Sequence, residues 1–243
     1  MSSLKGEINK GNEQWISIQV LRALAATIVV IGHVVGKLKH EYIALPDWLL
    51  GIWKISALGV DVFFVLSGLV MVLVSKQVAN DFSYAKVFLL RRAIRVFPIY
   101  WIAVSVFILL KMFSGSNVIE NNDLGYILQS FLLLPTMNSG GDYYPILGVG
   151  WTLIFEMFFY FVFSVFLLKA AKDRAILIVF SFLVLSAFGL WIQSSEPIVH
   201  FYANPLTLEF SSGVIIGVLL KKNIVLSQGK ALLMIGFSLL VFA

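Results

Sequence analysis

Five ionisable residues lie inside the long apolar stretches of this sequence, and they are the first candidates for chemistry. These residues are Arg22, His33, Asp61, Glu156 and Glu209. A charged side chain in the middle of a membrane-crossing helix costs about 2.5–3.5 kcal/mol on insertion scales, so each of them needs a partner or a function. An imidazole exchanges a proton near neutral pH, and a carboxylate beside it can fix its tautomer and stabilise its charged form.

The positions of these residues along the helices predict a shared site. Arg22 and His33 are 11 residues apart, so they face the same side of a helix and differ in depth by about 16 Å. Counted from the span ends, Asp61 and Glu156 fall near the outer ends of their helices, at a depth comparable to His33. We therefore expect one imidazole and two carboxylates to share a site. Each could instead hydrogen-bond to a neighbouring helix, and we expect Glu209, near a span end, to reach interfacial water.

Three arginines cluster just before the third apolar stretch. Arg91 and Arg95 are spaced i, i+4 and Arg92 and Arg95 are spaced i, i+3, so one helical face presents at least two guanidinium groups. Pro98 then opens the third span, at a position where its missing N–H costs little. The cluster is either an ordinary anchor for anionic lipid headgroups or a phosphate-binding site for a nucleotide-like donor, since the guanidinium fork matches phosphate oxygens.

The composition indicates which elements position these residues. The 243-residue chain is 60% hydrophobic and 13% charged, with a mean hydropathy of +0.94. Soluble domains carry about 25% charged residues, and a transmembrane barrel would show alternating segments of about ten residues rather than solid apolar blocks. The sequence has no Cys, which excludes a thiol nucleophile and a thiolate metal site. We therefore predict an all-α, polytopic transmembrane helix bundle without a bound metal.

The apolar blocks predict about six full spans and part of a seventh. The full spans lie near residues 16–36, 55–75, 97–113, 150–168, 175–193 and 205–220. A span needs about 20 residues, so 124–137 is expected to be a short interfacial or re-entrant segment, and 231–243 a truncated seventh span. Residues 1–243 form a single transmembrane domain in this interpretation.

The charges predict the orientation. With the N-terminus in the cytoplasm, 13 of the 18 Lys and Arg residues lie on the cytoplasmic side, in agreement with the positive-inside rule. If 124–137 crossed the membrane, the basic cluster at 169–174 would move outside. The expected location is therefore the inner membrane, with several spans and a cytoplasmic N-terminus.

Four segments together resemble the membrane-bound acyltransferase family 3. The segment 17–26 followed by His33 is similar to the Arg-x10-His pattern on the family's first helix. The segment 59–68 reads GVDVFFVLSG, and 91–101 contains the Arg-x-x-Arg element. The segment 150–160 looks like the family's Trp-Ser/Thr-Leu-x-x-Glu-x-x-Phe-Tyr block. The four elements occur in the family's order, and members usually carry several more spans.

The resemblance implies transfer of an acyl group, commonly acetyl from acetyl-CoA, to a hydroxyl of a cell-envelope glycan. It is closest to members that acetylate exopolysaccharides and O-antigens. By motif position, His33 would be the catalytic histidine with Arg22 as its partner, and Arg92 and Arg95 would lie on the donor side.

The mechanism that we expect combines both lines of reasoning. Arg91, Arg92 and Arg95 hold the phosphates of acyl-CoA on the cytoplasmic side, and the pantetheine arm brings the thioester toward His33. This histidine acts as general base on the acceptor hydroxyl or is acylated and relays the group. A carboxylate, Asp61 or Glu156, orients the imidazole. The expected partners are the lipid bilayer, acyl-CoA and a glycan, and no nucleic acid.

Two other classes of function stay open from the sequence. In a proton-coupled transporter or flippase, His33, Asp61, Glu156 and Glu209 would form a proton relay. Such proteins often contain inverted repeats with paired broken helices, which the sequence does not show. An inactive, truncated homologue with an interaction role is the third possibility.

Overall fold

The chain folds into a bundle of helices. The computed structural model describes residues 2–41, 45–76, 81–115, 123–222 and 224, and their side chains except those of 2–14, 40, 41, 171 and 172. The described residues contain α-helices, one short 3₁₀-helix and no strand. Six helical stretches are long and apolar enough to cross a membrane: 15–39, 47–74, 82–113, 148–166, 173–192 and 197–221. The predicted all-α bundle is confirmed, while the predicted seventh span at 231–243 lies outside the described residues.

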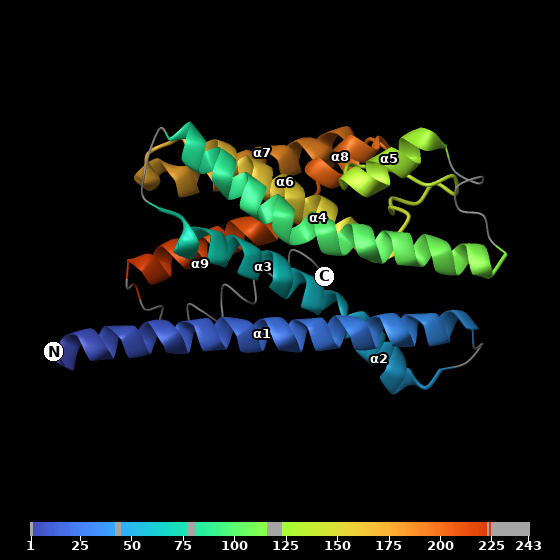
Figure 1. The fold of residues 1–243 in the computed structure, drawn as a ribbon, viewed down its shortest axis with the longest axis horizontal. Helices are drawn as coiled ribbons and strands as arrows, with labels where there is room; N and C mark the ends of the chain where they lie inside the picture. The colour runs from blue at the N-terminus through green and yellow to red at the C-terminus, as the bar shows by residue number, and fades with distance from the viewer. Residues whose placement is uncertain (1, 42–44, 77–80, 116–122, 223, 225–243) are drawn as a thin grey trace.

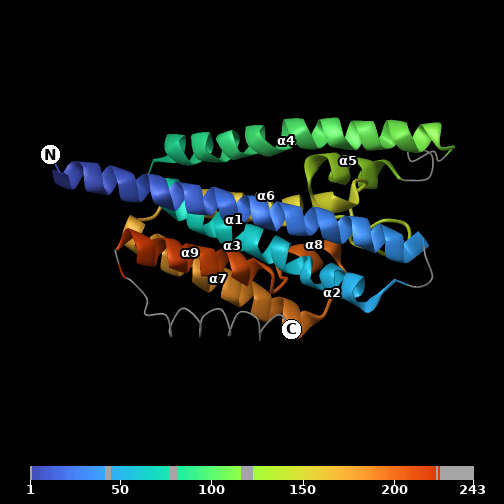
Figure 2. The ribbon, with the colours of Figure 1, turned by 90° about the horizontal axis from the view of Figure 1, so that it is seen from below.

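The helices run back and forth along one long axis (Figure 1). They are α1 (Ser2–Glu41), α2 (Asp47–Ile55), α3 (Ala57–Val74), α4 (Phe82–Phe113), α5 (Leu124–Leu132), η1 (Gly148–Gly150), α6 (Trp151–Phe166), α7 (Ala171–Ile192), α8 (Pro197–Tyr202) and α9 (Thr207–Lys221). Seen from below, α1 crosses over α3, with α4 on one side and α7 and α9 on the other (Figure 2). One span is bent, because α2 ends and α3 begins at Ser56, whose Oγ donates to the Trp53 carbonyl at 2.6 Å.

The bundle is centred on the close contact between α3 and α9. Glycines let the two backbones approach, since a Cβ on Gly68 would overlap the Phe210 carbonyl and one on Gly213 would overlap the Val65 carbonyl. In a membrane, where lipid tails are as apolar as the side chains, helices associate through such close packing. Beside this contact, Phe159 of α6 stacks on Phe210 of α9 with ring centroids 4.4 Å apart. The centre of the bundle is therefore closely packed and aromatic.

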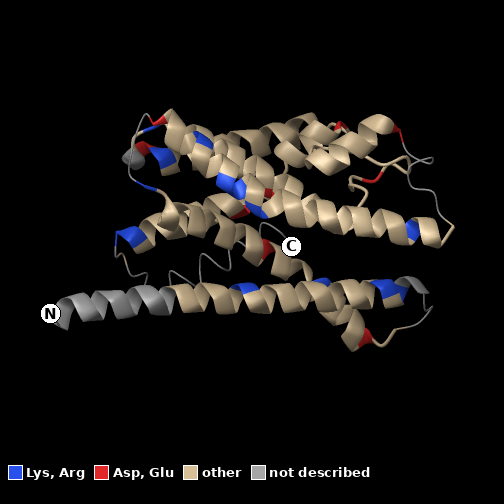
Figure 3. Ribbon diagram, in the orientation of Figure 1, with Lys and Arg blue, Asp and Glu red and all other residues tan. Residues whose placement is uncertain are grey.

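At one end of the bundle, basic side chains donate hydrogen bonds to backbone carbonyls at the end of a neighbouring helix. Arg174 is only 5% exposed and donates to the Lys76 carbonyl at 3.1 Å, while Lys221 Nζ donates to the Ser75 carbonyl at 3.2 Å. Positive charges at a helix C-terminus satisfy carbonyls that have no partner within the helix. In Figure 3, Lys and Arg gather at this end, on the first half of α4 and the neighbouring ends of α7 and α9.

The structure corrects the predicted start of the third span. We expected Pro98 to open this span, but α4 begins at Phe82 and continues through Pro98 to Phe113. The Asp81 side chain caps the helix by accepting from the Tyr84 N–H at 2.8 Å. Proline removes one backbone hydrogen bond, and spanning helices tolerate that loss better than an interruption that leaves several groups unpaired. The arginine cluster thus belongs to the spanning helix itself.

The segment between α4 and α6 does not cross the bundle, as predicted for 124–137. Its helix α5 has 9 residues, too few for a span. Asp123 caps it by accepting from the N–H groups of Gly125 and Tyr126, which lower the pKa of this carboxyl. The Tyr100 hydroxyl, from the middle of α4, donates to the Ser130 carbonyl at 2.8 Å. The segment therefore lies beside the second half of α4.

The glycine contact between α3 and α9 should be sensitive to a single methyl group. We expect Gly213→Ala to lower the melting temperature of the purified protein by several degrees, since overpacking costs about 1–3 kcal/mol and exceeds the gain in helix propensity of about 1 kcal/mol. Gly51→Ala is the matched control, because a Cβ there meets nothing within 4 Å. Thermal unfolding in detergent measures both variants. Equal melting temperatures for the two variants would contradict this packing.

Candidate functional site

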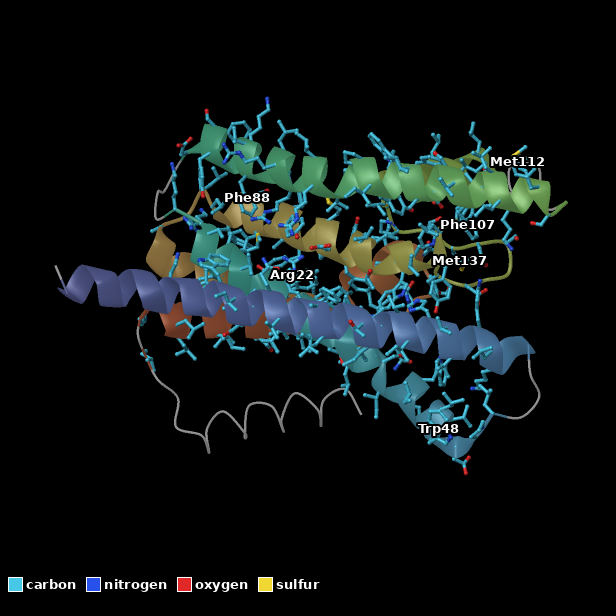
Figure 4. The ribbon with its side chains drawn as sticks, turned by 60° about the horizontal axis from the view of Figure 1, so that its bottom comes forward. Arg22, Trp48, Phe88, Phe107, Met112 and Met137 are labelled. Carbon is cyan, nitrogen blue, oxygen red and sulfur yellow. The ribbon has the colours of Figure 1, made fainter. Side chains whose placement is uncertain are left out.

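The arginines predicted to bind a donor lie in the first half of α4, and one of them is drawn into the bundle. Arg91 and Arg95 are exposed, whereas Arg92 is half-buried. The Arg92 guanidinium carbon lies 5.6 Å from the centre of the Phe88 ring and 5.7 Å from that of Tyr160. Cations over aromatic faces are attracted by the ring quadrupole. Figure 4 shows Phe88 on the side of α4 that faces α6. Arg92 therefore points into the bundle, while Arg91 and Arg95 lie on its surface.

A pocket lies between the end of α3 and the first turns of α4. It is lined by Val74, Tyr84, Val87, Phe88, Arg91 and Arg92. The Tyr84 hydroxyl is held in place by the Lys76 backbone N–H, which donates to it at 2.9 Å. Two guanidinium groups, a phenol and an apolar wall form a suitable place for a phosphate ester attached to an organic group. Arg95 is not among the lining residues, although we expected it to act with the other two.

Glu156 lies in a polar cluster that joins α3, α4 and α6. Its Oε1 accepts a short hydrogen bond from the Tyr160 hydroxyl, one turn further along α6. The same oxygen accepts from Ser67 Oγ at 3.4 Å. The Tyr160 ring also lies 5.7 Å from the Arg92 guanidinium carbon. Glu156 is therefore a neighbour of the arginine cluster.

Asp61 faces Glu209 across the contact between α3 and α9. Glu209 is 1% exposed, and neither of its carboxyl oxygens receives a hydrogen bond from an N–H or hydroxyl group in the described residues. Its side-chain neighbour across this contact is the half-buried carboxyl of Asp61. A hydrogen bond between two carboxyl groups requires that one of them carries a proton. Glu209, expected to reach interfacial water, is instead deeply buried.

His33 is exposed on α1, and its own helix fixes its tautomer. Nδ1 lies 2.8 Å from the Val29 carbonyl oxygen. A carbonyl can only accept, so Nδ1 carries the hydrogen in this contact, and in the neutral imidazole Nε2 keeps its lone pair. The structure shows this contact in place of the predicted one with Asp61 or Glu156. His33 can act as a base through Nε2 without a carboxylate to orient it.

Arg22 is half-buried on α1, at the same side of the helix as His33. Figure 4 shows Arg22 on the side of α1 that faces the rest of the bundle. Among the described side chains, none forms a hydrogen bond or an ion pair with it. A guanidinium cannot lose its charge in this position, so an anionic or carbonyl-bearing ligand is a natural partner.

Contacts between α1 and α3 give the relative depth of the site residues. A Cβ on Gly32, next to His33, would overlap the side chain of Ser56, so His33 is level with the start of α3. Ser67, which binds Glu156, is 11 residues further along the chain. At 1.5 Å per residue, the level of His33 and the level of Glu156 are about 16 Å apart.

The predicted group of His33, Asp61 and Glu156 is therefore divided among three places in the described structure. Glu156 lies with the arginines, Asp61 pairs with Glu209, and His33 lies about 16 Å from Glu156 along the helix axis. The catalytic roles of these residues, and of Arg22, stay predictions.

The depth of Glu156 follows from where α6 begins. A Cβ on Gly150 would lie 2.9 Å from the Tyr100 ring, in the middle of α4. The helix that carries Glu156 thus starts inside the bundle, and counting from its end as if it began at the surface places Glu156 too far out.

Sequence reasoning missed three residues of the site. Tyr160 follows Glu156 by four residues, a spacing that places both on one helical face and would have indicated the pair. Ser67 stands in the segment 59–68, but its partner comes from 89 positions away. No pattern in the sequence around Tyr84 indicates that it lines the pocket, because its position there depends on how α3 ends. Among the described residues, no group of three or more His, Asp or Glu could hold a metal ion.

Comparisons with known proteins agree with the order of these elements along the chain. The family described as "Acyltransferase domain", acyltransferase family 3, matches residues 15–243. The exopolysaccharide production protein ExoZ of Rhizobium meliloti (strain 1021) is 36% identical over 169 residues, which cover 68% of this chain and 51% of that protein. The chain thus spans about half the length of this curated relative. No solved structure matches the chain significantly. The chain belongs to acyltransferase family 3, as its four sequence elements predict.

Proposed function

We propose that this chain is an integral membrane O-acyltransferase that moves an acyl group, in our proposal acetyl, from acyl-CoA to a hydroxyl of an exported polysaccharide. The observation that carries the proposal is a cationic pocket at the basic end of the bundle, far along the axis from His33: Val74 in the pocket wall is 18 residues, about 27 Å, beyond Ser56, which is level with His33. Membership of acyltransferase family 3 and the printed name of the relative support the reaction and the class of acceptor.

The separation between the pocket and His33 suits a donor whose charged end and reactive end are far apart. In acyl-CoA the phosphates and the thioester are joined by the long, flexible pantetheine arm. Phosphates bound by Arg91 and Arg92 would let this arm extend along the bundle toward His33. A donor with its phosphate next to its reactive carbonyl could not contact both places at once.

The chemistry at His33 follows from its tautomer. Nε2 accepts the proton of the acceptor hydroxyl, and the oxygen attacks the thioester carbonyl carbon. The carbon–sulfur bond breaks, and the thiolate takes the proton from Nε2. If His33 is acylated first, Nε2 attacks the thioester carbonyl carbon and the carbon–sulfur bond breaks to release the CoA thiolate. The acceptor hydroxyl then attacks the acyl carbon, the carbon–nitrogen bond breaks, and the thiolate takes the hydroxyl proton. In both routes the Val29 carbonyl keeps Nδ1 protonated and Nε2 available.

The transporter alternative has less support from the geometry. A proton relay needs groups within hydrogen-bonding reach of one another or of bridging waters. In the described structure, His33, Glu156 and the pair of Asp61 and Glu209 form three separate groups. Membership of an acyltransferase family points in the same direction.

The proposed orientation has a cytoplasmic N-terminus in the inner membrane, and it can be tested because the sequence has no Cys. We expect a single cysteine from Ser139→Cys to react with a membrane-impermeant maleimide in intact spheroplasts. A cysteine from Lys222→Cys, at the basic end, should react only after the membrane is permeabilised. Labelling of both in intact spheroplasts, or the reverse pattern, would contradict the orientation.

Replacing His33 should remove the transfer activity without removing the protein from the membrane. We expect His33→Ala to reduce the rate of acyl transfer by about 100-fold or more, since general base catalysis contributes this much. Release of the CoA thiol and labelling of envelope glycan with radioactive acetyl-CoA measure the reaction in proteoliposomes. Val30→Ala, at a position that is 62% exposed on the same helix, is the control. Full activity of His33→Ala would refute the proposed mechanism.

Replacing Arg92 should weaken donor binding. We expect Arg92→Gln to raise the KM for acyl-CoA about tenfold or more, because a charge-assisted hydrogen bond to phosphate contributes about 1.5–3 kcal/mol. Lys222→Gln removes a cation from the same end of the bundle but outside the pocket, and its KM should stay unchanged. An unchanged KM for Arg92→Gln would contradict donor binding by Arg92 and would favour an arginine cluster that anchors anionic lipid headgroups.

A further inference from the structure

Glu156 has a set of partners that its place in the sequence does not suggest. One of its oxygens accepts hydrogen bonds from both the Tyr160 hydroxyl and Ser67 Oγ. Tyr160 is 4% exposed, and its ring also lies under the guanidinium of Arg92. A single tyrosine therefore contacts both the carboxylate and the arginine. Ser67 belongs to α3, Arg92 to α4, and Glu156 and Tyr160 to α6, so three helices meet at this cluster.

We propose that Tyr160 and Ser67 are positioning residues for the donor pocket: they fix Glu156 as the counter-charge that holds Arg92 in place for the donor phosphates. This inference rests on the proposed function, because it takes acyl-CoA as the ligand of the pocket. Neither residue needs to touch the donor. Both act through Glu156, which in turn acts on Arg92.

The burial of Arg92 is the first argument. A guanidinium that leaves water for a site among aromatic rings is expensive unless it finds an opposite charge or hydrogen-bond acceptors. Glu156 is held by the Tyr160 hydroxyl, and the Tyr160 ring lies 5.7 Å from the Arg92 guanidinium carbon, so this carboxylate is placed on the inner side of Arg92. Without a fixed Glu156, the long side chain of Arg92 would turn outward to water, away from the wall of the pocket.

The charges of the pocket are the second argument. One carboxylate balances one of the three arginines, and Arg91 and Arg95 remain exposed on the same helix. A cluster that was fully neutralised by the protein would have little attraction for an anion. A cluster with no counter-charge would not keep Arg92 inside. The arrangement leaves positive charge for a ligand that carries several phosphate charges.

Glu156 lies too far from His33 to orient its imidazole. Its level along the bundle is about 16 Å from that of His33, and one turn of a helix or a side chain rotation does not cover that distance. Loss of the Glu156 cluster should therefore change how tightly the donor binds rather than how fast the bound donor reacts. This separates the inference from the earlier expectation that Glu156 orients the imidazole.

The test measures binding of coenzyme A itself by calorimetry in nanodiscs, with no acyl group and no acceptor present. We expect Tyr160→Phe and Ser67→Ala to weaken the binding of CoA about three- to tenfold, since each removes a hydrogen bond to the charged carboxylate. Tyr202→Phe is the matched control, because this half-buried tyrosine stacks on Phe158 away from the pocket. Its affinity should equal that of the wild type.

A double-mutant cycle distinguishes positioning from a general effect on folding. If Tyr160 acts through Arg92, Tyr160→Phe should weaken CoA binding in the wild-type protein but have little further effect in the Arg92→Gln protein. In the transfer assay, Tyr160→Phe should raise the KM for acyl-CoA and leave kcat nearly unchanged. Equal losses in both backgrounds, or a fall in kcat with an unchanged KM, would overturn the inference.

The outcomes also separate this inference from the proposed function. If wild-type protein binds CoA and Tyr160→Phe binds it equally well, the positioning role is wrong and the proposed function stands. If the wild-type protein does not bind CoA, both are wrong.

Discussion

The cost of burying charge in an apolar bundle determines how this protein is organised. Arg174 and Lys221 bind carbonyls at helix ends, Arg92 lies over aromatic rings near Glu156, and Glu209 faces Asp61. For the three cations, the low dielectric makes a lone charge more expensive than the loss of side-chain freedom needed to pair it, whereas the two carboxyl groups can face each other because one of them carries a proton. Arg22 and His33 differ, because neither contacts a charged or carboxyl group in the described part of the chain. In the proposed function they are the groups that the substrates use, since neither is paired with a charged group of the described part of the chain.

The helix α3 connects the separate parts of the site. It packs against α9 through glycines, against α1 near His33, and against α6 where Ser67 binds Glu156. The segment 59–68 therefore serves three contacts within three helical turns. Small residues face α9, Ser67 faces α6, and Asp61 lies beside Glu209. A substitution in this segment would disturb the relative positions of the donor pocket and His33 even where it touches neither.

The sequence was sufficient for the spans, the basic end and the family, because these depend on composition and on local spacing. Arg92 and its neighbours could be placed on one helical face from their i, i+3 and i, i+4 spacing alone. The depth of Glu156 could not be predicted from local spacing, because it depends on where α6 begins. Gly150, just before α6, packs against the middle of α4 rather than against its end. The continuation of α4 through Pro98 was missed for a related reason. Local rules favour a helix start at proline, whereas an apolar surrounding favours one uninterrupted helix.

The division between pocket and histidine has a consequence for how the reaction is controlled. If phosphate binding and acyl transfer took place at one cluster, a change in charge there would alter both. Here Glu156 and Tyr160 lie at the level of Arg92, and the imidazole is oriented by a carbonyl of its own helix. Under the proposed function, donor affinity and the chemistry at His33 can therefore vary independently. The connection between the two places would be the donor itself, whose extended arm would reach from the arginines to His33. In that proposal, catalysis depends on the length of the acyl donor and not only on its charge.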